Sequence, residues 1–348
     1  MTVEKKYPKG IERVIIVATT IMASLLELID TTIVNVSLRH IAGSIGASTT
    51  DVMWVVTAYA ISNVIIIPLS SMLTELFGRK RYFTFSILLF TVASFMCGNS
   101  GTLVEIVSWR FIQGLGGGAL LALSQAVLLD TFPPEKLNMA SAIYGIGVTM
   151  GPALGPTLGG IITDNYSWQW IFFVNVPFGL LTAFCVWFYV GDQPNRKKPL
   201  IDWIGILYLA VGIGTLQYVL EEGNSKNWFE DRNITILSII SLIGIVSLII
   251  RELRVTNPVV NLKLFRAPNL AVGFVLNFVM IAIMFIGLYT FPLFVQIDLG
   301  WTATMTGLAL IPSSIATALG MVVCQKLLNK GVNPIYLMAS GFIATFVF

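Results

Sequence analysis

Long apolar runs recur along the whole chain, separated by short stretches that hold most of the charged residues. Most runs are roughly 20 residues long, which is the length a helix needs to cross the hydrocarbon core of a bilayer. We expect ten complete membrane spans and the start of an eleventh, with approximate limits 14–38, 52–74, 82–101, 103–129, 138–163, 170–190, 201–220, 233–250, 269–295, 303–324 and from about 334 onward. The pattern predicts an all-α polytopic membrane protein. Because the last run is still apolar at Phe348, we expect the chain to be a piece of a longer protein.

Basic residues are confined almost entirely to alternate loops of this predicted topology. Seventeen of the 21 Lys and Arg residues fall in one set of loops: Lys5, Lys6, Lys9, Arg13, Arg79, Lys80, Arg81, Lys136, Arg196, Lys197, Lys198, Arg251, Arg254, Lys263, Arg266, Lys326 and Lys330. The opposite loops hold Arg39, Lys226 and Arg232, and Arg110 lies within a span. Because cytoplasmic loops carry an excess of Lys and Arg, we expect the amino terminus to be cytoplasmic.

Composition excludes several other classes of protein. The chain is 56% hydrophobic and 11% charged, whereas soluble domains carry roughly 25% charged residues. The net charge of +3 follows the loops and therefore does not indicate nucleic-acid binding. Cys97, Cys185 and Cys324 have no disulfide or metal-binding spacing, and His40 stands alone at a predicted span end. We expect no metal, no cofactor and no catalytic residues.

Glu27, Asp30 and Arg110 lie well inside predicted spans, where burial is costly and a function is the default expectation. Glu27 and Asp30 lie in the first span, and their spacing places both carboxylates on one helical face. Two close carboxylates in a low-dielectric site cannot both ionise easily, so one should hold a proton near neutral pH. Such an acid is what proton coupling requires.

Arg110 lies in the fourth span at a depth that matches Asp30. It is about seven residues, or roughly 10 Å, from the outer end of its span, and Asp30 is roughly 12–13 Å deep. Pairing of the two is therefore plausible. Our hypothesis is that Arg110 competes with a proton, or with a cationic substrate, for Asp30. The alternative is a static ion pair that joins two helices.

The loop after the second span reads SSMLTELFGRKRYF. Arg79, Lys80 and Arg81 are explained by cytoplasmic anchoring, and Gly78 predicts a tight turn. Glu75 is not explained in this way. We expect its partner to be one of these basic residues or a helix N-terminus across the cytoplasmic surface, in an ionic contact that holds the inner face shut.

The fifth span reads GVTMGPALGPTLGG, with a glycine at every fourth position and two prolines: Gly147, Gly151, Pro152, Gly155, Pro156, Gly159 and Gly160. Small residues admit close packing between membrane helices, so the glycines predict a contact groove. Prolines remove backbone donors and bend a helix. A packing seam is one interpretation. Our hypothesis is a helix that packs closely, bends at a fixed point and seals the cavity against proton leak.

Taken together, these stretches resemble the major facilitator superfamily, and most closely its fourteen-span drug:proton antiporters, the EmrB/QacA group. The stretches that show this resemblance are LIDTTIVNVSL, SSMLTELFGRK, RFIQGLGGG, GVTMGPALGPTLGG, WQWIFFVNVP and NPVVNLKLF. Ser71 replaces the usual first glycine of the loop motif, and Glu75 replaces its aspartate. The resemblance associates Arg110 with proton transfer and adds Gln113 from the same motif to the candidate site. It also implies the major facilitator fold.

The span count favours the fourteen-span branch over the twelve-span one. The loop RELRVTNPVVNLKLFR shows no second copy of the loop motif, whereas a degenerate copy, CQKLLNKG, follows the tenth span. The expected organisation is a cytoplasmic tail (1–13), a six-helix bundle (14–190), a cytoplasmic loop (191–200), two inserted spans (201–250), a second cytoplasmic loop (251–268) and an incomplete C-terminal bundle (269–348).

The resemblance implies a proton-driven exporter of small lipophilic or cationic compounds in the bacterial cytoplasmic (inner) membrane. It needs no cofactor beyond the proton gradient. In a double-membraned bacterium it allows a periplasmic adaptor and an outer-membrane channel as partners. The alternatives are an importer of the same superfamily, a polytopic membrane enzyme and an ion channel. The glycine-proline span argues against the first, the lack of a reactive cluster against the second, and the lack of a filter-like loop against the third.

Overall fold

The computed structural model describes residues 7–48, 51–191, 202–256 and 258–347, and within those ranges it contains helices and no strand. Each of the eleven predicted apolar runs corresponds to one helix or to two consecutive helices. A backbone in hydrocarbon has no water to bond, and a helix satisfies its N–H and C=O groups within one segment. The predicted all-α class is confirmed.

The α-helices follow the predicted runs. They are α1 (Ile11–Ile45), α2 (Trp54–Phe77), α3 (Arg79–Gly98), α4 (Leu103–Gly117), α5 (Leu120–Thr131), α6 (Leu137–Asn165), α7 (Trp170–Phe173), α8 (Asn175–Tyr189), α9 (Trp203–Glu222), α10 (Arg232–Arg254), α11 (Pro268–Ile297), α12 (Ala303–Asn329) and α13 (Pro334–Val347). Short 3-10 turns are η1 (Asp51–Met53), η2 (Pro134–Lys136), η3 (Trp228–Glu230) and η4 (Leu262–Arg266). Over the described residues, nine stretches are long and apolar enough to cross a membrane, and shorter apolar stretches lie in α11 and α13. The complete span count stays a prediction.

The predicted spans 103–129 and 170–190 are each divided between two helices in the structure. The span expected at 103–129 is divided into α4 and α5 by a turn at Gly118 and Ala119, directly after two further glycines. Glycine is a poor helix former, and this run of three weakens the helix locally. The division gives α5 its own N-terminus inside the bundle, with N–H groups that have no partner within α5.

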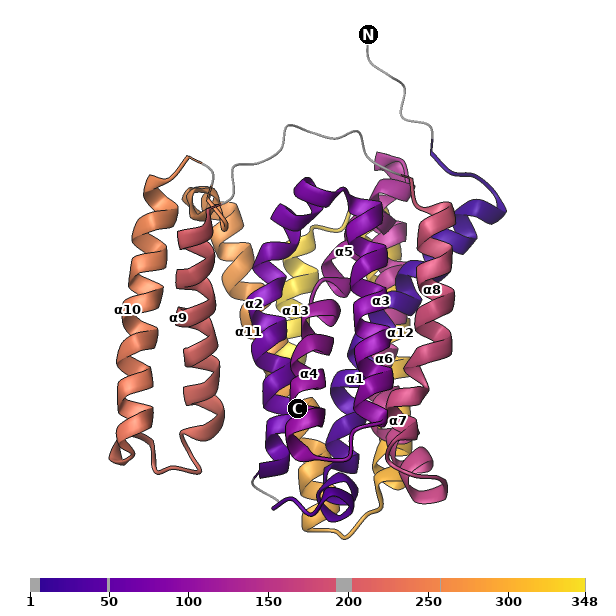
Figure 1. Ribbon diagram of the computed structural model, residues 1–348. Helices are drawn as coiled ribbons and strands as arrows, with labels where there is room; N and C mark the ends of the chain where they lie inside the picture. Colours follow the sequence, from indigo (N-terminus) through magenta and orange to yellow (C-terminus); the bar gives the residue numbers. More distant parts are fainter. Residues whose placement is uncertain (1–6, 49–50, 192–201, 257, 348) are drawn as a thin grey trace.

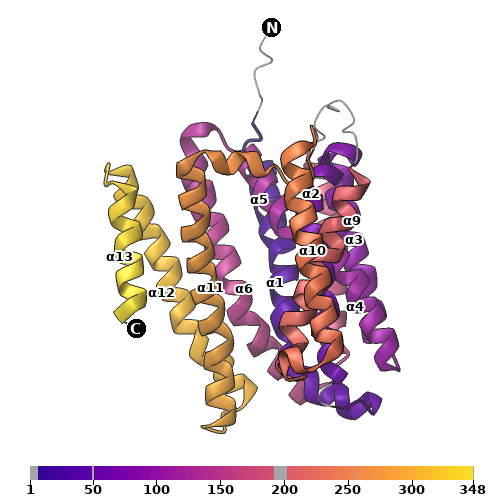
Figure 2. The same ribbon diagram turned by 90° about the vertical axis from the view of Figure 1, so that its left-hand side faces the viewer.

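Helix α1 lies at the centre of the N-terminal bundle and packs against α5, α6 and α8. Helix α4 packs against both α2 and α3. The pair α9–α10 stands beside α2, whereas α11, α12 and α13 form a separate group that contacts the bundle through α12 against α6 (Figures 1 and 2). The central position of α1 brings its acidic residues within reach of several helices.

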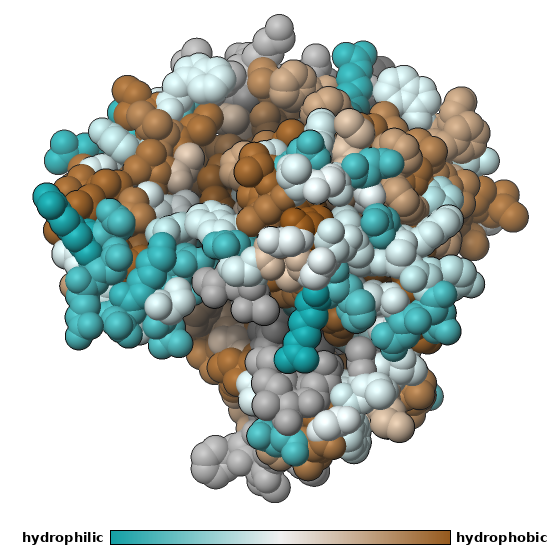
Figure 3. Space-filling model, turned by 60° about the horizontal axis from the view of Figure 1, so that its bottom comes forward, coloured by the Kyte–Doolittle hydropathy of each residue, from teal (hydrophilic) through white to brown (hydrophobic). Residues whose placement is uncertain are grey.

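Three of the turns that carry basic residues lie at the same end of the bundle. The turns that follow α2, α10 and α12 lie at the end where the N-terminus is found (Figure 1). Seen from the opposite end, hydrophilic residues gather across the end face and hydrophobic residues cover the flanks (Figure 3). Residues 1–6 of the predicted tail and 192–200 of the predicted loop lie outside the described residues. The cytoplasmic assignment of the N-terminal end stays a prediction.

An ion pair and a pair of glycines hold α9 against α10. Gly212 and Gly244 bring the two backbones into close contact, and Oγ of Ser241 donates to the carbonyl of Gly212 at 2.9 Å. At the other end, Nε of Arg251 donates to both carboxylate oxygens of Asp202 at 2.8 Å. Asp202 also caps α9, because its Oδ1 accepts from the N–H of Gly205 at 3.0 Å.

We expect Asp202→Ala to lower the free energy of unfolding by about 1 kcal/mol through the lost cap, and Asp202→Asn to lower it less. The hydrogen bonds from Arg251 hold the pKa of Asp202 below its usual range. This charge-dependent stabilisation is therefore complete above a pH of about 4 and is lost as the pH falls through the lowered pKa of the folded state. Thermal unfolding of detergent-solubilised protein measures both effects. A stability difference between wild type and Asp202→Asn that did not shrink in acid would contradict the assignment.

Candidate functional site

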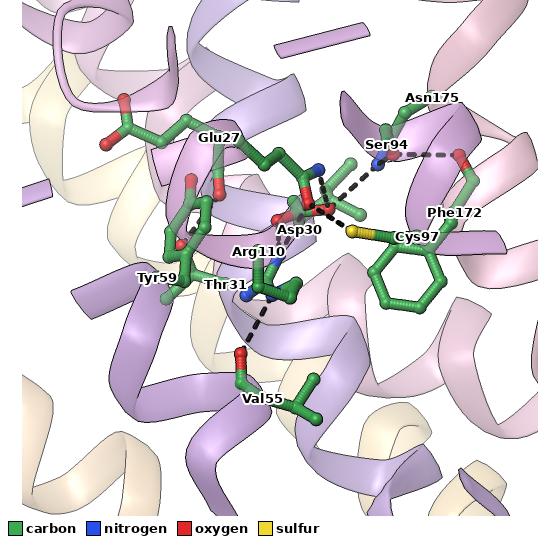
Figure 4. Close-up of polar contacts among 12 residues, drawn as sticks. Glu27, Asp30, Thr31, Val55, Tyr59, Ser94, Cys97, Arg110, Phe172 and Asn175 are labelled. Carbon is green, nitrogen blue, oxygen red and sulfur yellow. Dashed lines mark hydrogen bonds and ion pairs between the residues drawn. The ribbon is translucent and has the colours of Figure 1, made fainter. Parts of the chain in front are cut away.

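Asp30, in the middle of α1, is at the centre of a buried polar cluster (Figure 4). It is 0% exposed, and its Oδ2 lies 2.5 Å from Nη1 of Arg110. Its Oδ1 accepts hydrogen bonds from Nε2 of Gln113 and Nδ2 of Asn175, both at 2.9 Å. The pairing of Asp30 with Arg110 that was expected from their matching depths is present, and Gln113 lies in the same cluster.

Arg110, on α4, is also 0% exposed and has several partners besides Asp30. Its Nε donates to the carbonyl of Val55 at 2.9 Å, and Nη1 donates to Oε1 of Gln113 at 2.9 Å. The guanidinium carbon lies 4.0 Å from the ring centroid of Tyr59, within the range of a cation–π interaction. Because a buried charge without partners is strongly destabilising, these contacts are what allow an arginine at this depth.

Sequence reasoning did not single out Asn175, Ser94 or Tyr59. Asn175 enters the cluster from α8 and also donates to Oγ of Ser94 at 3.0 Å, and Ser94 in turn donates to the carbonyl of Phe172 at 3.0 Å. Asn175 lies within the WQWIFFVNVP motif. An amide inside an apolar span is costly to bury without partners, and that signal would have identified Asn175 as a candidate.

Glu27, three residues before Asp30, is 4% exposed and has a different set of contacts. Its Oε1 accepts from Nδ2 of Asn63 at 3.3 Å, and its Oε2 accepts from the backbone N–H of Leu121 at 3.2 Å. Leu121 lies in the first turn of α5, where free N–H groups and the helix dipole favour a negative group. In the described part of the chain, no basic side chain pairs with Glu27.

The glycines of α6 face α1, the helix that carries both acids. A Cβ added at Gly155 would lie 1.8 Å from Oγ1 of Thr32, and one at Gly151 would lie 2.7 Å from Cβ of Leu28. Further glycines at 147 and 159 meet α1 as closely, and Pro152, Pro156 and Gly160 are buried on the same helix. Helix α6 continues through both prolines without interruption. The predicted contact groove is therefore present, and α1 packs directly against it.

The loop motif contains an ion pair that the sequence did not indicate. Gly78 has a φ of +86°, as a tight turn requires. The turn directs Arg79 toward α5, where it pairs with Asp130. Lys80 lies 5.2 Å from the ring centroid of Trp187.

Glu75 does not make the expected contact with the basic residues that follow it. Within the described residues it makes no ion pair. With Ser71 it lines a pocket of about 550 Å³, whose other wall includes Asp202 and residues 258–261. Glu75 lies one turn before Gly78, on the face of α2 that looks toward α9, so the turn separates it from the basic residues that follow.

The cluster contains two carboxyl groups and one guanidinium group but, in the described residues, no metal-binding set. In the part of the chain that the structure describes, no three His, Cys, Asp or Glu side chains gather in a way that could hold a metal ion. The two buried carboxylates can bind a proton or an organic cation, whereas the guanidinium of Arg110 stays charged.

Residues 20–348 match the family model "Major Facilitator Superfamily". The chain therefore belongs to this superfamily of multi-pass membrane transporters. A solved structure with a similar fold is "Crystal structure of peptide transporter POT in complex with sulfate", with a TM-score of 0.59 at 15% identity, covering 94% of this chain and 71% of that one.

Among individual proteins, the chain is 36% identical over 312 residues to "Multidrug export protein EmrB" of Haemophilus influenzae, covering 88% of this chain and 61% of that protein. It is 34% identical over 328 residues to "Fatty acid resistance protein FarB" of Neisseria gonorrhoeae, covering 94% of this chain and 64% of that protein. The chain thus spans about three fifths of the length of the curated relatives it matches.

Proposed function

We propose that the protein is a proton-coupled efflux antiporter that exports small lipophilic or cationic compounds by alternating access, and that it is not an enzyme. The observation that carries this proposal is the charge balance of the buried cluster. Two carboxylates, Glu27 and Asp30, share the interior of the bundle with one cation, Arg110. With both acids ionised the cluster has one uncompensated negative charge.

An uncompensated charge in a low-dielectric site is costly, and it is neutralised either by a proton or by a bound cation. If the proton and the substrate occupy the site in turn, the movement of one is coupled to the movement of the other. Antiport follows when the site opens alternately to the two sides of the membrane. The close packing of α6 against α1 supports this role, and we propose that it keeps water from the back of the site.

The similarity to proteins named for multidrug export and fatty acid resistance supports export of lipophilic compounds. On the same basis we place the protein in the bacterial cytoplasmic (inner) membrane. In a double-membraned bacterium a periplasmic adaptor and an outer-membrane channel would be its partners.

The test is transport by the complete protein in proteoliposomes loaded with a fluorescent cation such as ethidium. An imposed pH gradient should drive ethidium toward the side of higher proton concentration, and collapse of the gradient by a protonophore should stop it. Liposomes without protein are the control. Movement of substrate together with protons in the same direction would instead identify an importer, and gradient-independent movement would contradict coupling.

A further inference from the structure

The two acids of α1 differ in their surroundings, and the difference separates their roles. We infer that Glu27 carries the exchangeable proton and receives the cationic nitrogen of a substrate, whereas Asp30 stays ionised as the permanent partner of Arg110. This inference rests on the proposed function, and it departs from the hypothesis that the proton competes with Arg110 for Asp30.

The donors around Asp30 stabilise its ionised form. Its Oδ2 faces the guanidinium of Arg110, and its Oδ1 accepts from two amide groups, of Gln113 and Asn175. These three donors fill most of the roughly four acceptor sites of an ionised carboxylate, and a proton on Oδ1 would displace one of the amides. It would also leave Arg110 buried without its counter-ion, which costs several kcal/mol.

Glu27 has the opposite surroundings. Its two hydrogen bonds come from neutral donors, the amide of Asn63 and the N–H of Leu121, and both are longer than 3.1 Å. The titratable groups that interact with it are Asp30 on its own helix, Tyr59 on α2 and Tyr144 on α6. Arg110 is committed to Asp30, Val55 and Gln113, so Glu27 has no counter-ion.

A polar atom next to Glu27 lacks a partner and fits a nitrogen donor. Oδ1 of Asn63, the residue whose amide group contacts Glu27, is buried and accepts no hydrogen bond within the described residues. A cationic substrate could pair with Glu27 while an amino group on the same substrate donates to Oδ1 of Asn63.

The exchange balances in charge and in protons. In the empty site the Glu27 carboxyl keeps its O–H bond and the cluster is neutral. When the substrate cation arrives, the O–H bond breaks, the proton leaves to water, and the carboxylate pairs with the cation. The total charge of the site is the same in both states, so neither state leaves a buried charge unpaired.

Glu27→Gln tests the inference, with Glu27→Asp as the conservative variant and Glu105→Gln as the matched control. Glu105 is an exposed acid at the start of α4, away from the cluster. In weakly buffered detergent solution, wild type and Glu105→Gln should release about one proton for each ethidium bound. Glu27→Gln should release none and should bind ethidium at least about tenfold more weakly. Glu27→Asp should restore part of the release.

Infrared spectroscopy provides a readout that needs no ligand. Wild type near neutral pH should show the carbonyl band of a buried protonated carboxyl group, and Glu27→Gln should lack it while unfolding at the same temperature as wild type or higher. Proton release that persists in Glu27→Gln, or absence of the band in wild type, would overturn the inference. Either result is compatible with gradient-driven efflux by wild type, whereas loss of that efflux would overturn the proposed function itself.

Discussion

Arg110→Ala is expected to abolish efflux and to lower the free energy of unfolding by about 3–5 kcal/mol. The substitution leaves Asp30 ionised and fully buried without its cation. It also removes the donors to the carbonyl of Val55 and to Oε1 of Gln113, so further buried acceptors lose a partner. Denaturant unfolding in detergent and efflux in proteoliposomes measure the two effects.

A double variant separates the cost of the unpaired charge from the role of the pair in transport. Asp30→Asn combined with Arg110→Gln removes both charges and keeps side chains that can hydrogen-bond. We expect it to recover much of the lost stability, because neither member of the pair is left as an unpaired buried charge. It should also recover part of the efflux, because removing one negative and one positive charge leaves the net charge of the cluster unchanged and keeps Glu27. Arg110→Ala that unfolded at the same denaturant concentration as wild type would show that the ion pair contributes little.

Gly155→Val is expected to have the second largest effect, because it separates α6 from α1. A Cβ at position 155 would lie 1.8 Å from Oγ1 of Thr32 and 2.8 Å from its Cβ. Thr32 cannot turn aside freely, since Oγ1 donates to the carbonyl of Leu28 at 2.9 Å. Overpacking of this kind costs about 1–3 kcal/mol. It would also move Asp30, two residues away, relative to Arg110.

We therefore expect Gly155→Val to lose efflux and to raise the proton permeability of proteoliposomes. Gly43→Ala is the matched control, because Gly43 lies on α1 but nothing is within 4 Å of the added Cβ. Gly155→Ala should impair efflux less than valine, and Thr32→Ala should partly rescue it by removing the clashing oxygen. Unchanged efflux and unchanged proton permeability in Gly155→Val would rule out a sealing role for this groove.

The pairing of Asp30 with Arg110 could be predicted because depth in a membrane span follows from counting residues. A helix rises by a constant distance per residue, so two charges at similar depths in neighbouring spans can meet. The same counting could not say which helix is the neighbour. Asn175 joins the pair only because α8 packs against α1, and packing between distant segments depends on side-chain shapes that no local pattern reveals.

Glu75 shows the limit of reading charges along the sequence. It lies four residues before Arg79, and nearness along the chain suggested a partner among the following basic residues. The turn at Gly78 begins a new helix, and the direction of that helix assigned Arg79 to Asp130 instead. Asp130 is 51 residues from Arg79 along the chain, so only the folded arrangement could identify it.

The sequence by itself determined the helical class, the positions of the apolar runs, the loops that carry the basic residues and the acids, arginine and glycines of the candidate site. These follow from hydrophobicity, from the cost of burying charge and from the period of the helix, which all act locally. Only the tertiary structure decided that the glycines of α6 face α1 and that the N-terminus of α5 lies beside Glu27. It also decided that Asp30 has a cationic partner while Glu27 has none. Those features depend on which helices meet and in what register, because a hydrogen bond or ion pair forms only within a few ångströms.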